Sequence, residues 1–315
     1  MRQADGGRQA PAISGRNIYR GEICGTWHNI RMLPPIFYKY AGADTALAVL
    51  SNQSLRWSSP ELFNDVLEFR RFPRFVPDPV ATIPSYLATL ARAAAGEAEV
   101  DLARLNARSR KMLVSFGATL ASGTTLEQLI ARIEPVSGIA PFDLDDRLGE
   151  FFQISGARVL CLTETPLNQA MWGNYAENAS GCVLGFRTLP ESAWAQAKKV
   201  TYTDKLPAIG TGLDLHLYGL DRKMLSGTVQ AVCFSKRAEW SYEKEWRVMI
   251  WENSPNVNNY NDFSFLPDEL ESVTLGSRAT NGAESEIRNI LKRLYPSCQL
   301  YRVTIKKGEA HRMSI

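Results

Sequence analysis

Strand-like segments that follow one another at short intervals set the strongest limit on the fold of this chain. They are rich in β-branched and aromatic residues, and they lie at 36–41 (IFYKYA), from 55, at 157–165 (ARVLCLTET), 181–187 (GCVLGFR), 198–204, 239–251, 270–279 and 298–307. Parallel strands need a long crossover between them, whereas antiparallel strands can be joined by short connections. Helical segments at 44–53, 168–179, 213–235 and 284–296 accompany the strands. The sequence therefore predicts an α+β fold with a mostly antiparallel sheet.

A different pattern occupies the region from about 79 to 150. Leucine and alanine recur at helical spacing in 84–96, 101–122 and 125–133, and the pattern is interrupted at Gly96 and Gly123. We expect a single α+β domain over 34–315 that carries this region as an inserted helical subdomain. Residues 1–33 lack the hydrophobic core of a secretory signal and are expected to form an N-terminal tail.

The composition limits the function classes. The 315 residues contain no apolar run of the length that a membrane span needs, and the net charge of +3 does not demand a polyanionic partner. Five scattered cysteines and three histidines form no zinc-binding spacing, so no metal site is expected. An odd number of cysteines in apolar settings favours reduced thiols and a cytoplasmic location. Phosphate-binding loops and serine nucleophile elbows are absent from the sequence.

The segment EWSYEKEWRVMIW (239–251) is the most aromatic part of the chain and contains two closely spaced glutamates. Its apolar residues alternate, which predicts a strand, most firmly from Glu245 onward. In an extended chain, Glu243, Glu245 and Arg247 project from the same face. Two carboxylates at this spacing can shift one another's pKa and divide the roles of charged group and proton acceptor. The alternative is a solvated polar face on which Arg247 pairs with Glu243 or Glu245.

Several segments resemble a bacterial family catalogued as domain of unknown function twenty-nine seventy-one. The residues that carry the resemblance are YKYA (38–41), LRWSSPELFNDVLEF (55–69), CLTETPLNQAMWGNYAENASGCVLGF (161–186) and WSYEKEWRV (240–248). They occur in the family's order over most of 36–251, outside the helical insertion. One departure is Val66, which stands where the family usually has a proline.

The order of elements is also similar to that of ADP-ribosyltransferases, which is an analogy at the level of the fold. This resemblance implies an ADP-ribosyltransferase-like sheet, NAD as the substrate, a catalytic Glu245 and a general base at Glu243. The positions that correspond to the cofactor-binding residues are Tyr38, Lys39, Thr163, Thr165, Trp172 and Tyr175. The sequence departs from the pattern at Tyr38 and Lys39, where a histidine or arginine is expected.

Cleavage of the nicotinamide–ribose bond passes through an oxocarbenium-like state, which a nearby carboxylate such as Glu245 can stabilise. Tyr175 or Trp172 is expected to stack on the nicotinamide, and Lys39 to meet the phosphates. Each residue also has a structural interpretation. The two aromatic residues can belong to the core, Thr163 and Thr165 suit any strand, and Lys39 can be a solvated strand residue. Asn64 and Asp65, candidates for orienting the substrate together with Arg247, can equally close a turn.

The expected function is an NAD-dependent ADP-ribosyltransferase-like enzyme that modifies a protein or nucleic acid, as a bacterial defence effector or toxin. The basic and aromatic segment FRRFPRF (69–75) is a weak indication of nucleic acid. A catalytically inactive binding module with the same fold is one alternative. A metal-dependent nuclease-like effector is another, and it would need a third acid, Asp65 or Glu68.

Overall fold

The computed structural model describes residues 33–133, 154–252 and 258–315. The predicted tail at 1–33 therefore lies almost wholly outside the described residues. Residues 134–150, the last part of the predicted insertion, also lie outside them. The chain folds as two compact units. The first comprises the described residues within Met1–Val66, Gln153–Asp204 and Phe234–Ile315, and the second those within Leu67–Phe152 and Lys205–Cys233.

A large sheet forms the centre of the first unit. Its main path runs β11 (Tyr260–Ser264), β2 (Ser54–Ser58), β4 (Ala157–Thr163), β1 (Ile36–Ala41), β5 (Cys182–Arg187), β12 (Leu270–Leu275), β13 (Gln299–Lys306) and β14 (Glu309–Ser314). Strand β10 (Glu245–Trp251) pairs with β4 along its length, and also with the short β6 (Lys198–Lys199). Within this sheet, β12 and β13 are parallel and the other pairs are antiparallel.

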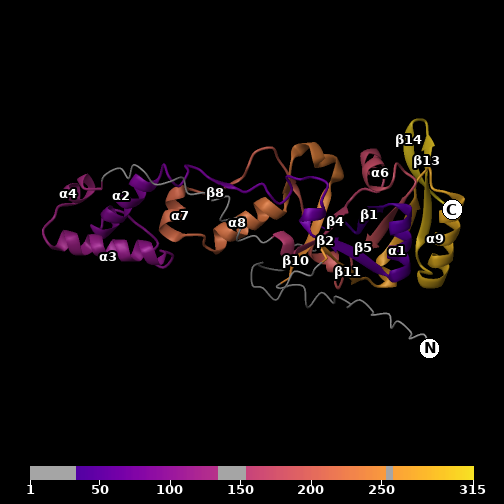
Figure 1. Cartoon of the computed structure of the whole chain (residues 1–315), viewed down its shortest axis with the longest axis horizontal. Helices are drawn as coiled ribbons and strands as arrows, with labels where there is room; N and C mark the ends of the chain where they lie inside the picture. The colour runs from indigo at the N-terminus through magenta and orange to yellow at the C-terminus, as the bar shows by residue number, and fades with distance from the viewer. Residues whose placement is uncertain (1–32, 134–153, 253–257) are drawn as a thin grey trace, which may run out of the picture. The chain divides into compact units, whose positions relative to one another are not determined.

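Helices cover both faces of this sheet (Figure 1). On one face lie α1 (Ala43–Asn52) and α9 (Asn281–Leu294), and residues such as Leu50 and Ile287 join them to the larger hydrophobic core. On the other face lies α6 (Gln169–Tyr175), which packs Met171 and Trp172 against Tyr38 and Tyr40 of β1. The predicted α+β fold with a mostly antiparallel sheet is confirmed.

Two strands of the sheet have no counterpart among the predicted elements. Strand β11 has the sequence YNDFS and β14 has EAHRMS, and neither alternates apolar with polar residues. Both lie at the ends of the main path, and β14 is largely exposed. A strand at an edge needs no continuous apolar face, so its sequence carries little periodic signal.

The segment 239–251 is only partly extended, which corrects the prediction for its first half. Residues Ala238–Glu243 form a 3-10 helix (η5), Lys244 adopts the left-handed conformation with φ 44°, and the strand begins at Glu245. Glu243 and Glu245 therefore do not share a face through strand alternation. Their relative position is set instead by the turn at Lys244.

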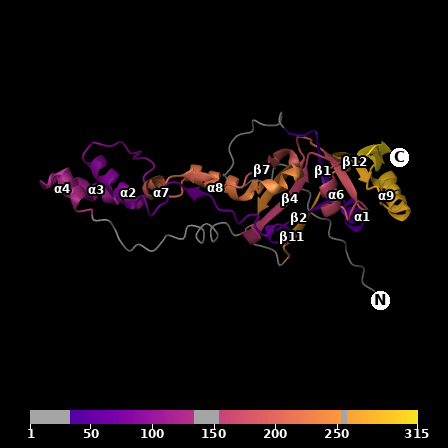
Figure 2. The same ribbon diagram turned by 90° about the horizontal axis from the view of Figure 1, so that it is seen from above.

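The second unit is mainly helical (Figure 2). It contains α2 (Ile83–Ala94), α3 (Ala107–Ala121), α4 (Leu126–Ala131), α7 (Gly212–Tyr218) and α8 (Arg222–Cys233), with a short parallel pair of β3 (Arg74–Phe75) and β8 (Ala208–Gly210). One core cluster contains Tyr86 and Leu90 of α2, Leu217 of α7, and Leu105, which precedes α3. The helical region predicted from leucine and alanine spacing thus packs with α7, a helix that comes later in the chain. Among the described residues, no helix has the length and apolar character needed to cross a membrane.

Candidate functional site

The candidate site lies where β4 ends and β10 begins. Glu245, the first residue of β10, is the register partner of Thr163 at the end of β4. Thr163 is also the register partner of Tyr38 in β1. Because side chains directly opposite one another in paired strands lie on the same face, Glu245, Thr163 and Tyr38 share one face of the sheet. This is the face that α6 covers.

Glu245 is almost fully buried and forms an ion pair with a cation of its own, Arg247. The Arg247 guanidinium, which has no exposed surface, donates from Nε to Glu245 Oε1 at 2.7 Å and from Nη2 to Oε2 at 3.0 Å. The backbone N–H of Glu245 donates to the Tyr202 hydroxyl at 2.7 Å, and the Cys161 thiol donates to the carboxylate. This two-pronged ion pair fixes both the charge and the orientation of Glu245.

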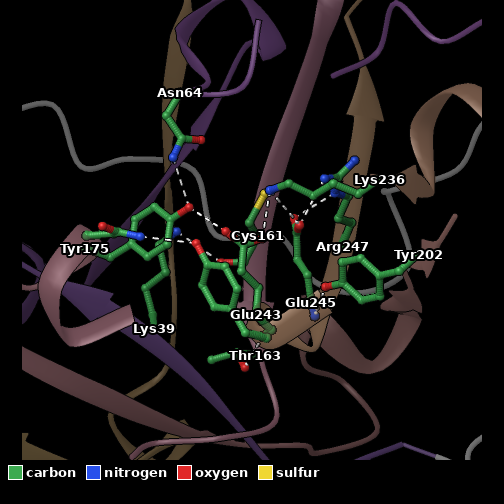
Figure 3. Close-up of polar contacts among 12 residues, drawn as sticks. Lys39, Asn64, Cys161, Thr163, Tyr175, Tyr202, Lys236, Glu243, Glu245 and Arg247 are labelled. Atoms are coloured by element: carbon green, nitrogen blue, oxygen red, sulfur yellow. Dashed lines mark hydrogen bonds and ion pairs between the residues drawn. The ribbon is translucent and has the colours of Figure 1, made fainter. Parts of the chain in front are cut away.

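Lys236, the last residue of β9 (Ser235–Lys236), joins the two glutamates. Its Nζ lies 2.7 Å from Glu243 Oε2 and 3.6 Å from Glu245 Oε2 (Figure 3). Glu243 is 3 % exposed, and its other oxygen accepts a hydrogen bond of 2.5 Å from the Tyr175 hydroxyl. Two carboxylates and two cations therefore share a buried cluster in which each oxygen of Glu243 has a different partner.

The surroundings shift the pKa values of the two carboxyl groups in opposite directions. Burial raises the pKa of Glu243 above its usual range, although Lys236 and the Tyr175 hydroxyl favour the ionised form. Burial acts the same way on Glu245, but Arg247 and then Lys236 outweigh it and hold the pKa of Glu245 at about 2. The surroundings therefore favour the ionised form of Glu245, and Glu243 is the more readily protonated of the two.

Tyr175, the last residue of α6, reaches this cluster and also contacts the loop after β2. The Asn168 side chain caps α6 by accepting from the Met171 N–H, and its amide donates to the carbonyl oxygen of Tyr242 in η5. One side chain thereby fixes the start of α6 relative to the segment that carries Glu243. The exposed Asn64 donates to the Tyr175 hydroxyl at 3.0 Å. Asn64 and Tyr175, predicted from widely separated segments, are therefore in contact.

Thr163, Thr165 and Lys39 lie beside the cluster and make hydrogen bonds that involve the backbone. Thr163 donates to the carbonyl oxygen of Glu243 at 2.6 Å, and its hydroxyl accepts from the Thr165 N–H. Lys39 donates to the carbonyl oxygen of Cys161 at 3.0 Å. The Tyr38 hydroxyl instead accepts from Arg312 on β14, at 3.4 Å.

Of the two aromatic candidates, only Tyr175 meets the carboxylates. Trp172 is buried, packs edge-on against Tyr40 and donates its indole N–H to the carbonyl oxygen of Pro166. Its partners are those of a core residue. Asp65 is half-buried in the loop that follows Asn64 and has a polar or ring contact of its own.

Sequence reasoning missed three members of the cluster, namely Lys236, Tyr202 and Cys161. Lys236 and Tyr202 are register partners in the short parallel pair of β7 (Thr201–Tyr202) and β9. Strands of two residues carry no periodic signal, so neither position stood out. A lysine that follows the apolar run AVCFS (231–235) was the available hint, because a lysine in such a setting is seldom buried without a paired carboxylate.

The described parts of the chain contain no group of three histidine, cysteine, aspartate or glutamate side chains placed to share a metal ion. Asp65, which lies in the same unit as the two glutamates, therefore does not join them in such a group.

The part of the chain that matches a known family model includes both glutamates of this site. A family model described as "Protein of unknown function (DUF2971)" matches residues 171–248, from α6 into β10. The match contains Tyr175, Lys236, Glu243, Glu245 and Arg247, and it leaves out the earlier segments YKYA and LRWSSPELFNDVLEF. No curated protein and no solved structure matches the chain. The resemblance to this family is supported over these residues, whereas the ADP-ribosyltransferase-like order of motifs has no support from the comparisons.

Proposed function

We propose that this chain is an ADP-ribosyltransferase-like enzyme that uses NAD as a substrate and transfers ADP-ribose to a protein or nucleic acid. The observation that carries the proposal is the pair of buried carboxylates at the start of β10, whose pKa values are displaced in opposite directions. Divided protonation of neighbouring acids is typical of sites that hold one group charged while another exchanges a proton.

In the proposed reaction, Glu245 is the electrostatic partner of the ribose. When the bond between ribose C1′ and nicotinamide breaks, both electrons leave with the ring, and positive charge develops on the ribose. A carboxylate already ionised and oriented by Arg247 can stabilise this charge without having to reorganise. Glu243, with its raised pKa, serves as the proton acceptor for the attacking group.

The rival interpretation is an inactive binding module in which the same cluster only stabilises the fold. Incubation with NAD labelled in both the nicotinamide and the adenosine halves separates the two. The proposal predicts nicotinamide release and transfer of the adenosine label to protein or nucleic acid from a cell lysate. Release should fall by about a hundredfold to a thousandfold in Glu245→Gln.

Glu252→Gln is the matched control, because Glu252 pairs with a different buried arginine, Arg158, beyond the far end of β10. It should keep the wild-type rate to within a few fold. No release by the wild-type chain with any acceptor would refute the enzyme, and equal rates in Glu245→Gln and the wild type would refute the assignment of Glu245. Protection of the wild-type chain by NAD against thermal unfolding tests binding separately from turnover.

A further inference from the structure

The hydroxyl of Tyr175 makes two hydrogen bonds that fix the position of its proton. The Asn64 atom in contact is the amide nitrogen, which can only donate, so the hydroxyl oxygen accepts from it at 3.0 Å. The hydroxyl proton then points to Glu243 Oε1, 2.5 Å away. Tyr175 is therefore oriented as a donor to the carboxylate and as an acceptor on the side where the exposed Asn64 lies.

Exposure increases along this chain of contacts. Glu243 is 3 % exposed, Tyr175 is half-buried and Asn64 is exposed. The second oxygen of Glu243 is occupied by Lys236, which is itself buried. A proton that reaches Glu243 from outside therefore has the Tyr175 hydroxyl as its hydrogen-bonded route (Figure 3).

We infer that Tyr175 relays the proton of the attacking acceptor to Glu243. The inference rests on the proposed function and reassigns Tyr175, which the resemblance placed under the nicotinamide ring as a stacking residue. In the relay, the acceptor oxygen or nitrogen bonds to ribose C1′ as the C1′–nicotinamide bond breaks. The acceptor proton passes to the Tyr175 oxygen while the tyrosine proton passes to Glu243 Oε1. Neutral nicotinamide leaves with the bonding electrons, and Glu243 later returns its proton to water.

The charges around Glu243 suit a group that accepts and returns a proton. The titratable groups that face it are Lys236 from β9, Glu245 from β10, Tyr202 from β7, Tyr175 from α6 and Tyr242 from η5. Burial and the neighbouring Glu245 favour the protonated form, whereas Lys236 and Tyr175 favour the ionised form. These opposing influences keep both forms of Glu243 within reach.

Tyr175→Phe tests the relay against stacking, because phenylalanine keeps the ring and removes only the hydroxyl. The relay predicts that ADP-ribose transfer falls by about a hundredfold or more, since general acid–base steps contribute on that order. It also predicts that the pKa of Glu243 rises in this variant, because a hydrogen bond that stabilises the carboxylate is lost. Stacking predicts a rate within about threefold of wild type, and that result would overturn the relay.

Tyr242→Phe is the matched control, because its hydroxyl lies nearby but accepts from Asn174. It should leave both the rate and the titration of Glu243 unchanged. If Tyr175→Phe fails to fold, Asn64→Ala takes its place at an exposed position, and the relay then predicts a transfer rate several-fold lower. An unchanged rate in Asn64→Ala would count against the relay.

A carbon NMR titration of labelled glutamate, with Glu243 assigned by Glu243→Gln, keeps this inference distinct from the proposed function. If the wild-type chain releases no nicotinamide, the NAD proposal fails, and the Glu243 titration then tests only the proton route between Tyr175 and Glu243. A pKa that rises in Tyr175→Phe and stays constant in Tyr242→Phe supports the proton route. Identical titrations in all three proteins overturn it, even if Tyr175→Phe has lost activity.

Discussion

Two arginines with no exposed surface, Arg158 and Arg247, lie toward opposite ends of the β4–β10 pair and meet very different partners. Arg158 donates to three backbone carbonyl oxygens, of Ser155, Ala157 and Asn258, and to the Asn261 side chain. Its carboxylate partner, Glu252, lies 3.3 Å away and is partly exposed. Arg247 instead donates to both oxygens of the buried Glu245, which a second glutamate adjoins through Lys236.

The difference shows that a buried guanidinium is by itself no sign of chemistry. Arg158 is surrounded mainly by neutral acceptors, which satisfy its donors and secure the ends of β4 and β11. At Arg247, negative groups outnumber what one cation can neutralise, so a second buried cation is present and the two carboxylates differ in proton affinity. We attribute structure to the first cluster and chemistry to the second, and the following changes test that division.

The largest effect on stability is expected from Arg247→Met compared with Arg158→Met. Arg247→Met leaves Glu245 buried without its main cation, which should cost about 3–5 kcal/mol of unfolding free energy at neutral pH. Arg158→Met leaves neutral carbonyl groups and a partly exposed carboxylate without the guanidinium that donates to them, and should cost about 1–3 kcal/mol. Urea unfolding monitored by circular dichroism measures both. A larger loss of stability in Arg158→Met than in Arg247→Met would contradict the distinction between the two arginines.

Acid titration of stability is expected to separate wild type from Glu245→Gln. The folded-state pKa of Glu245 is lowered from 4.5 to about 2, so its ionisation stabilises the fold above pH 4.5. That contribution, on the order of 3 kcal/mol, is lost as the pH falls through about 2. The raised pKa of Glu243 acts in the opposite sense, because its ionisation weakens the fold as the pH rises above 4.5. Unfolding free energies of wild type and Glu245→Gln that decline in parallel between pH 5 and 2 would contradict the low pKa.

Tyr202→Phe should produce an intermediate effect. The change leaves the Glu245 N–H, at the start of β10, without its hydroxyl acceptor, which should cost about 1–2 kcal/mol. Tyr260→Phe is the control near the Arg158 end, because the ring that stacks on Arg56 is retained, and it should cost less than about 0.5 kcal/mol. Thermal unfolding of the two variants measures the difference. Equal stability would mean that the Tyr202 hydroxyl does not support β10.

The smallest effect should come from Arg56→Ala, which removes an exposed ion pair between β2 and β11. Arg56 and Asp262 lie 3.1 Å apart with side chains 54 % and 39 % exposed. Solvent screens such pairs, so the loss should stay below about 1 kcal/mol. A cost equal to that of Arg158→Met would show that burial is not what distinguishes the arginines of this sheet.

The sequence was sufficient for the elements that carry a clear period. Segments such as 157–165 and 181–187 formed the expected strands, and the leucine and alanine spacing of 84–133 formed helices. The polar edge strands β11 and β14 were missed because their residues do not alternate. The turn at Lys244 was missed because it depends on a left-handed backbone conformation at a residue whose type does not favour it.

The candidate site was predictable only in part. Glu243, Glu245 and Arg247 stand close together in the sequence, so their proximity was expected, although the reason was a turn and not strand alternation. Lys236 comes from a strand of two residues, and Tyr175 reaches Glu243 from α6, so tertiary packing decides both contacts. Periodicity cannot predict such contacts, and Tyr175 was singled out only by the similarity to the order of elements in ADP-ribosyltransferases.

The most direct test of the division between the two clusters is a residue-resolved titration of Glu243 and Glu245 in the wild-type chain. Carbon NMR of labelled glutamate, with assignments from Glu243→Gln and Glu245→Gln, follows each carboxyl group separately. We expect the pKa of Glu245 to be about 2, and the pKa of Glu243 to lie above the ordinary glutamate value. Two carboxyl groups that titrate together near the ordinary value would contradict a divided acid–base pair and, with it, the chemical role of this site.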